Sequence, residues 1–251
     1  MKAGVYIPPE HRIPWVESIF YGTVLKRALR KAFHAVMVAG GENLKEATAH
    51  GSAVVCSNHT NWWDGFSASW VTRHVVPGCG YMLAMDAKNL ARYRFFEWLG
   101  VFGVRLSEPR AAALALRGAA EAMSRGREAC WIFPQGELLH PSIPVTAKSG
   151  AVWLAKKAGV PLVPVAFSYE WLIESRPVLL ARVGAPLATL DDAALAAAIN
   201  MLREQVVRDA AALDLKEYAP ILEPRRSLNN RWDQVMAMVR GKHGSKERFN
   251  R

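Results

Sequence analysis

Short apolar runs alternate along the chain with amphipathic and alanine-rich stretches. The apolar runs predict a buried strand at 52–56 and further strands at 129–133, 160–167 and 178–183, and 81–85 and 101–106 are two more short apolar runs. Helical spacing and alanine-rich composition predict helices at 62–72, 89–99, 109–125, 146–158 and 191–213. Strands that alternate with helices predict an α/β fold, in which helices flank a mixed, mainly parallel-type sheet.

The first long pattern, residues 14–38, is amphipathic and predicts a helix that ends before Gly40 and Gly41. Its apolar positions are Trp15, Ile19, Phe20, Val24, Leu25, Leu29, Phe33 and Val36, and between them lie Lys26, Arg27, Arg30, Lys31 and His34. Two interpretations stay open. The helix covers the core of its own domain, or it lies in the headgroup region of a membrane, which aromatic residues opposite Lys and Arg favour.

Length and composition suit one sizeable core. The 251 residues are 51% hydrophobic. We predict an N-terminal amphipathic helical segment (1–41), an α/β domain (42–223) and a basic C-terminal tail (224–251), which is either solvated or in contact with lipid headgroups. No uncharged apolar run reaches the ~18 to 20 residues that span a bilayer. We therefore expect a peripheral, monotopic protein at the cytoplasmic face of the cell membrane.

The net charge of +10 attracts anionic membrane surfaces, phosphorylated substrates or nucleic acid. No zinc finger or RNP-type motif is present, so charge alone motivates a nucleic-acid binder and we expect no such partner. Three widely spaced cysteines, Cys56, Cys79 and Cys130, show no CxxC or Cys/His spacing. They predict neither a disulfide framework nor a metal site, and they fit a reducing cytoplasm.

A polar loop follows the predicted strand 52–56 and leads into the predicted helix 62–72. Its His59 and Asp64 are five positions apart across this turn, where their side chains can meet. A carboxylate that accepts one ring N–H fixes the tautomer and leaves the other nitrogen as a general base. Acyl transfer from a thioester to an alcohol needs such a base, because a hydroxyl is a poor nucleophile at neutral pH. Taken alone, the pair also suits a histidine that completes a structural network.

Four segments resemble, in order, the sequence blocks of the glycerolipid acyltransferases, the family of bacterial 1-acylglycerol-3-phosphate acyltransferase. HTNWWD at 59–64 resembles the HxxxxD signature, and GVFGVR at 100–105 resembles the second block. FPQGE at 133–137 resembles the third block, FPEGTRS, and VPLVPV at 160–165 the fourth. The third block departs from the family, because Gln135 replaces Glu and Glu137, Leu138 and Leu139 replace Thr-Arg-Ser.

The resemblance implies a glycerolipid acyltransferase-like fold and direct transfer of a fatty acyl group from acyl-CoA or acyl carrier protein to a lysolipid acceptor, without metal or bound cofactor. It makes His59 the base and Asp64 the group that orients it. Arg105, Gln135, Gly136 and Lys148 are the expected substrate-binding residues. Lys148 stands where the family often carries Phe-Lys-x-Gly, and Arg105 would neutralise an anionic headgroup. Gly136 either offers a turn N–H to the oxyanion or is a plain turn glycine.

The altered third block leaves the acceptor open. The family's third-block Arg commonly contributes to phosphate recognition, and a phosphate monoester forms charge-assisted hydrogen bonds with two cationic partners. The candidates are therefore a 1-acylglycerol-3-phosphate-like lysolipid and another lipid alcohol, such as a lyso-ornithine lipid, a glycolipid or a glycosylated terpenoid. A membrane-binding protein with a degenerate site is the remaining alternative. We expect Trp62 and Trp63 to pack in the core rather than to line an acyl groove.

Overall fold

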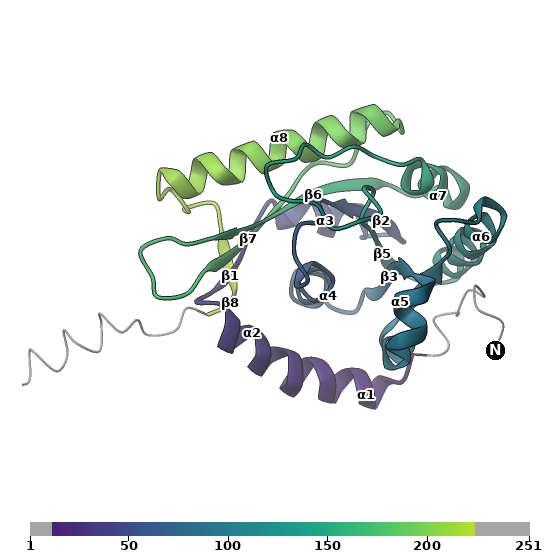
Figure 1. The fold of residues 1–251 in the computed structure, drawn as a ribbon, viewed down its shortest axis with the longest axis horizontal. Coiled ribbons are helices and arrows are strands. Elements are labelled where there is room, and N and C mark those ends of the chain that lie inside the picture. Colours follow the sequence, from purple (N-terminus) through teal and green to yellow (C-terminus); the bar gives the residue numbers. More distant parts are fainter. Residues whose placement is uncertain (1–11, 224–251) are drawn as a thin grey trace, which may run out of the picture.

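The computed structural model describes residues 12–223, which form an eight-stranded sheet with helices on both faces (Figure 1). The strands are β1 (Val36–Ala39), β2 (Ala53–Ser57), β3 (Gly80–Asp86), β4 (Val101–Val104), β5 (Glu128–Ile132), β6 (Leu162–Glu170), β7 (Val178–Val183) and β8 (Ala219–Leu222). The helices are α1 (Pro14–Ile19), η2 (Phe20–Leu25), α2 (Lys26–Ala32), α3 (Gly41–Ala47), α4 (Asp64–Val75), α5 (Ala87–Arg92), η3 (Arg94–Leu99), α6 (Pro109–Arg125), α7 (Gly150–Ala158) and α8 (Asp192–Ala211). The predicted basic tail lies outside the described residues.

The sheet is mixed and mainly parallel, as predicted. Its strand order is β4-β3-β5-β2-β6-β7-β1-β8. The first five strands of this order run parallel, so their carboxyl ends meet at one edge. β7 returns antiparallel to β6, β1 is parallel to β7, and β8 is antiparallel to β1. The loops that follow β2, β4 and β5 therefore lie along a common edge.

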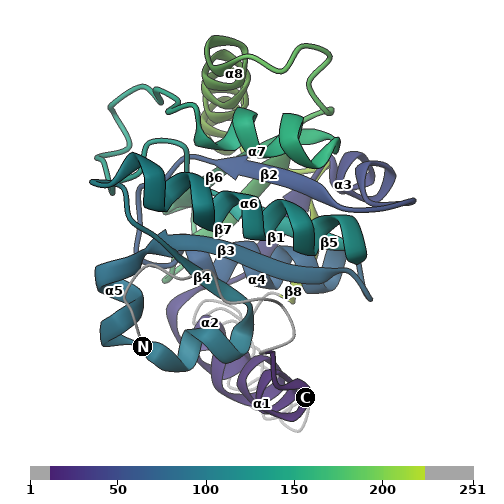
Figure 2. The same ribbon diagram turned by 90° about the vertical axis from the view of Figure 1, so that its right-hand side faces the viewer.

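Helices cover both faces, which explains the continuous apolar strands (Figure 2). In β2, Ala53 and Val55 pack into the cluster on the α4 side, and Val54 and Cys56 pack into the cluster formed with α6, α7 and α8. A strand that is buried on both faces needs apolar residues at every position. This double burial makes β2 a rigid base for the loop that follows it.

β6 is longer than its neighbour β2. Its last pairing with β2 joins Val165 to Ser57, and five further residues, 166–170, follow in β6. At ~3.3 Å per residue, this extension of β6 continues for roughly 17 Å past the end of β2. β7 pairs with one side of the extension. The loop after β2 lies on the other side, where a longer β2 would have been.

The N-terminal helical segment is shorter than expected. The predicted helix over 14–38 ends at Ala32, and Val36–Ala39 form strand β1 instead. Phe33 is already extended, and the β-branched Val36 and Val38 suit a strand that pairs with β7. Helix α3 and strand β8 were also missed, because their apolar patterns are short.

The two faces of α1, η2 and α2 have different surroundings. Tyr21, Leu25, Leu29 and Phe33 are buried in the core cluster on the α4 side. Trp15, Ile19 and Val24 remain 67%, 56% and 52% exposed. The inner face therefore covers the protein's own core, whereas the outer face exposes apolar side chains beside the exposed residues Lys26, Arg27, Arg30 and Lys31. Within residues 12–223, no helix has the length and apolar character to cross a membrane.

The centre of the sheet depends on Trp131 in β5. It is fully buried, stacks against Phe167, and its Nε1–H donates to Thr72 Oγ1 at 2.8 Å. We expect Trp131→Ala to lower the free energy of unfolding by about 3–5 kcal/mol, because it leaves a cavity and removes the hydrogen bond to Thr72 Oγ1. Chemical denaturation measures the loss. Trp171→Ala is the control, since Trp171 is 71% exposed and its loss should cost no more than about 0.5 kcal/mol; equal losses would contradict this account.

Candidate active site

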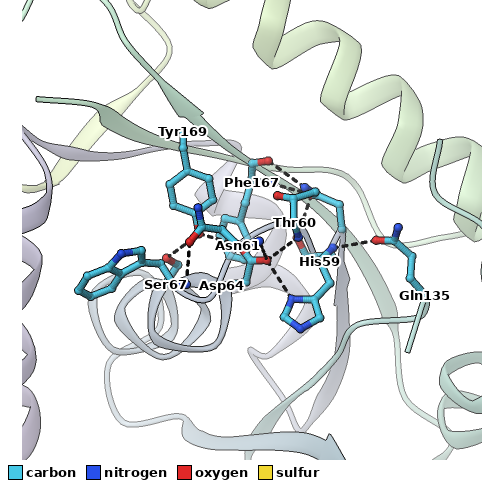
Figure 3. Close-up of polar contacts among 11 residues, drawn as sticks. His59, Thr60, Asn61, Asp64, Ser67, Gln135, Phe167 and Tyr169 are labelled. Atoms are coloured by element: carbon cyan, nitrogen blue, oxygen red, sulfur yellow. Dashed lines mark hydrogen bonds and ion pairs between the residues drawn. The ribbon is translucent and has the colours of Figure 1, made fainter. Parts of the chain in front are cut away.

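His59 and Asp64 meet in the loop between β2 and α4. His59 Nδ1 lies 2.9 Å from Asp64 Oδ2 (Figure 3). The side chain of Asp64 has no solvent exposure, whereas that of His59 is 23% exposed. A carboxylate only accepts hydrogen bonds, so the ring donates its Nδ1–H. The other ring nitrogen, Nε2, is then left as an acceptor.

The carboxylate of Asp64 also organises the loop around it. Oδ2 accepts hydrogen bonds from the backbone N–H groups of Thr60 at 2.7 Å and Asn61 at 2.8 Å. Oδ1 accepts the hydroxyl of Tyr169, from the extension of β6, at 2.5 Å. Asp64 is the first residue of α4, where the helix dipole favours a negative charge. Together with Nδ1–H of His59, these three donors compensate the burial of the charge.

Two neighbours fix His59 itself. Its ring stacks on Phe133 with centroids 4.2 Å apart and an interplanar angle of 8°. Its backbone N–H donates to Gln135 Oε1 at 2.8 Å. One face and the Nδ1 edge of the ring are therefore occupied, and Gln135 is buried against the loop. The observed contact of Gln135 Oε1 holds the backbone of His59 in position. A direct contact between Gln135 and substrate stays a prediction.

Asn58 connects the loop to β6. Its Oδ1 accepts from Phe167 N at 2.9 Å, and its Nδ2 donates to Phe167 O at 3.0 Å. The side chain thus continues the hydrogen-bond pattern of the sheet where β2 has ended. Asn58 is buried, and this pair of bonds sets the position of the extension of β6 relative to His59.

Gly136 and Lys148 lie together in the turn after β5. Gly136 has a φ of +75°, and a Cβ on it would be 2.9 Å from Lys148 Nζ and 3.5 Å from Leu106 Cδ1. The N–H of Gly136 donates to Phe133 O at 3.0 Å. This bond closes the turn and favours the interpretation of Gly136 as a turn glycine. Lys148 is exposed, so its ammonium group is accessible to an anion.

Arg105 follows β4 at the same edge of the sheet and is engaged with an acidic neighbour. Its Nη1 donates to both carboxylate oxygens of Glu108 at 2.9 Å. The side chain of Arg105 is 30% exposed. An anionic headgroup at Arg105 would therefore compete with Glu108. Its contact with substrate stays a prediction.

The two tryptophans of the HTNWWD segment have different environments. Trp62 is 66% exposed, so the expectation that it packs in the core is wrong. Trp63 is partly buried, packs against the core cluster and contacts Phe33 with ring centroids 5.3 Å apart. Trp62 packs on Phe66 at 4.8 Å and leaves its outer surface open.

Sequence reasoning missed the contacts of Tyr169 and Phe133 with the pair, and the bonds between Asn58 and β6. Asn58 and Phe133 lie within or beside the conspicuous segments, but Tyr169 is 105 residues from Asp64. The three cysteines are free and buried, and burial raises the pKa of the Cys56 and Cys130 thiols. No group of three or more His, Cys, Asp or Glu residues between 12 and 223 could hold a metal ion.

The chain belongs to the acyltransferase family: residues 35–168, more than half of the sequence, match the family described as Acyltransferase. It is 25% identical over 238 residues to a 1-acyl-sn-glycerol-3-phosphate acyltransferase of Saccharomyces cerevisiae, covering 86% of this chain and 71% of the relative. A crystal structure of the 1-acyl-sn-glycerophosphate (LPA) acyltransferase PlsC from Thermotoga maritima aligns with a TM-score of 0.48 and 20% identity, over 76% of this chain and 78% of that one.

The role of Lys148 can be tested by substituting two glycines that share a positive φ but differ in their distance from this lysine. Gly136 and Gly159 both have positive φ, but a Cβ on Gly159 meets nothing within 4 Å. We expect Gly136→Ala and Gly159→Ala to lower the free energy of unfolding by similar amounts, about 1–2 kcal/mol. In each variant the alanine must adopt a left-handed backbone conformation. Only Gly136→Ala should also slow acyl transfer, because it displaces Lys148 Nζ. Equal activity of the two variants would argue against a role for this lysine.

Proposed function

We propose that this chain transfers a fatty acyl group from acyl-CoA or acyl carrier protein to the free hydroxyl of a lysolipid, in phospholipid biosynthesis. The acceptor that we favour is a 1-acylglycerol-3-phosphate-like lysolipid. His59 acts as the general base and Asp64 orients it. The single observation that carries the proposal is the 2.9 Å contact between His59 Nδ1 and the buried Asp64 carboxylate, with the ring partly open to solvent at the edge where the parallel strands end.

The proposed reaction needs no covalent intermediate. Nε2 of His59 takes the proton of the acceptor hydroxyl while that oxygen attacks the thioester carbonyl. This attack forms the ester C–O bond and a tetrahedral intermediate, and the collapse of that intermediate restores the carbonyl and breaks the C–S bond. The imidazolium then returns its proton to the departing thiolate. Asp64 stabilises the imidazolium in between, which is the role that a buried carboxylate performs beside a catalytic histidine.

The proposed acceptor draws on the relative from Saccharomyces cerevisiae, whose name specifies 1-acyl-sn-glycerol-3-phosphate. The exposed Lys148 beside the turn at Gly136 could pair with its phosphate. Cations near a phosphate monoester give short, charge-assisted hydrogen bonds. Gln135, Gly136 and Arg105 complete the proposed substrate-binding set.

A less charged lipid alcohol is the second candidate acceptor. The observation that favours it is the contact of Arg105 Nη1 with both carboxylate oxygens of Glu108, together with the exposed apolar Leu138 in the third block. Both features reduce the positive charge that is available to a phosphate. Lyso-ornithine lipid, glycolipid and glycosylated terpenoid acceptors share the lower charge and the free hydroxyl.

We also propose that the outer face of α1, η2 and α2 docks on an anionic membrane surface. Its exposed Trp15, Ile19 and Val24 supply apolar contact, and the basic residues of α2 supply charge. This combination suits a helix in the headgroup region. Docking would bring the lysolipid acceptor and the catalytic edge to the same surface, at the cytoplasmic face of the cell membrane.

The test of the proposed chemistry is release of free CoA or carrier-protein thiol by the purified chain with a panel of lysolipids. We expect thiol release only when an acceptor is present, and a loss of about 10³-fold or more in kcat for His59→Ala, since the base is removed. His74→Ala, in α4 but away from Asp64, is the control and should retain activity. Acceptor-independent or absent thiol release would contradict the proposed function, and the preferred acceptor separates the two candidates.

The membrane proposal is tested with matched charge changes. The double variant Lys26→Gln/Arg27→Gln should bind phosphatidylcholine vesicles that contain phosphatidylglycerol about 30-fold more weakly, at about 1 kcal/mol per charge. Lys156→Gln/Lys157→Gln is the control, because these exposed residues are on α7, at the opposite face of the sheet (Figure 2). Co-sedimentation measures binding. Equal weakening by both pairs would show that only total charge matters.

A further inference from the structure

We propose that Tyr169 is a positioning residue of the active site: its hydroxyl holds the carboxylate of Asp64 in place and limits the basicity of His59. The contact that supports this is the hydrogen bond from Tyr169 Oη to Asp64 Oδ1, 2.5 Å long (Figure 3). The inference rests on the proposed function of His59 and adds a third group to the pair. Tyr169 also lies just beyond the residues, 35–168, that match the acyltransferase family.

The two oxygens of Asp64 have unequal support. Oδ2 has three partners, which are His59 Nδ1 and the backbone N–H groups of Thr60 and Asn61. Among residues 12–223, Oδ1 receives one hydrogen bond, from Tyr169. Asp64 has no solvent exposure, so water cannot replace this donor without rearrangement. A buried charged oxygen without a partner is costly.

The ring of Tyr169 is itself held in place. It belongs to the extension of β6 and packs against Phe33, with ring centroids 5.7 Å apart. Ser67 Oγ of α4 lies 3.5 Å from its hydroxyl. Tyr169 is thus held by the sheet, by Phe33 just after α2, and by α4. A small rotation of Asp64 away from His59 would break its bond to Tyr169.

The phenol of Tyr169 stays protonated near neutral pH and so remains a hydrogen-bond donor to Asp64. Burial, and then the negative charge of Asp64, raise the pKa of its phenol well above the usual range. The titratable groups in contact with Asp64 within the described chain are His59 and Tyr169, and the remaining partners are backbone N–H groups. A permanent donor at Oδ1 withdraws negative charge from the carboxylate, which lowers the affinity of the adjacent imidazole for a proton.

The test is the pH dependence of Tyr169→Phe, which keeps the ring and removes the hydroxyl. Without its donor, the carboxylate of Asp64 holds more negative charge and stabilises the imidazolium form of His59 more strongly. Because the base must be neutral, the limb on which kcat/KM increases with pH should move upward by about half a unit. We expect kcat to fall about tenfold while KM for donor and acceptor changes less than about twofold, because the carboxylate is less well placed in the transition state.

Tyr81→Phe is the matched control. The hydroxyl of this buried tyrosine donates to Gly65 O at 2.9 Å, also at the start of α4, but it makes no contact with Asp64. We expect its pH limb to coincide with that of the wild type. If Tyr169→Phe keeps the wild-type kcat and pH limb, or loses activity only as far as Tyr81→Phe does, the inference is wrong.

A second substitution covers the case in which Tyr169→Phe does not fold. Site-specific replacement of Tyr169 by 3-fluorotyrosine keeps the shape and makes the phenol a stronger donor. The limb should then move to lower pH, and an unchanged limb overturns the inference. Failure of the proposed function is distinguishable, because it appears as full activity in His59→Ala, whatever the behaviour of the Tyr169 variants.

Discussion

A carboxylate without contact with solvent needs donors at both of its oxygens, and Asp64 obtains them from two parts of the chain. His59, Thr60 and Asn61 come from its own loop, and Tyr169 comes from β6. The same bonds that compensate the buried charge close the loop and orient the imidazole. Loop conformation, tautomer and reactivity therefore depend on one desolvated group. The doubly covered strand β2 and helix α4 supply the rigid ends between which this loop is held.

Much of the sheet could be predicted from the sequence, because its central strands are buried on both faces. The runs at 81–85, 129–133 and 178–183 correspond closely to β3, β5 and β7, and helix α6 has the predicted bounds. β1 was assigned to a helix because a short apolar run after an amphipathic helix continues its pattern. Its pairing with β7, more than a hundred residues away, decides its conformation.

The candidate pair was predictable for a local reason, since His59 and Asp64 lie in one turn. Its supports were not, because Phe133 and Gln135 follow β5 and Tyr169 belongs to β6, so that they contact the pair only in the folded chain. Trp62 was predicted wrongly. Its size suggested that it packs in the core, but its position in the loop leaves its side chain exposed to solvent. Arg105 stands where the sequence blocks predict it, yet its contact with Glu108 depends on the start of α6.

Because β6 extends past the end of β2, the register of this extension decides which side chain reaches Asp64. Successive side chains of a strand point to opposite faces, so a slip by one residue would replace Tyr169 at Asp64 with Ser168 or Glu170. A carboxylate in that place would repel Asp64 instead of donating to it. The paired bonds between Asn58 and the backbone of Phe167 prevent such a slip, two residues before Tyr169. The buried amide of Asn58, next to His59, thus fixes the register of β6.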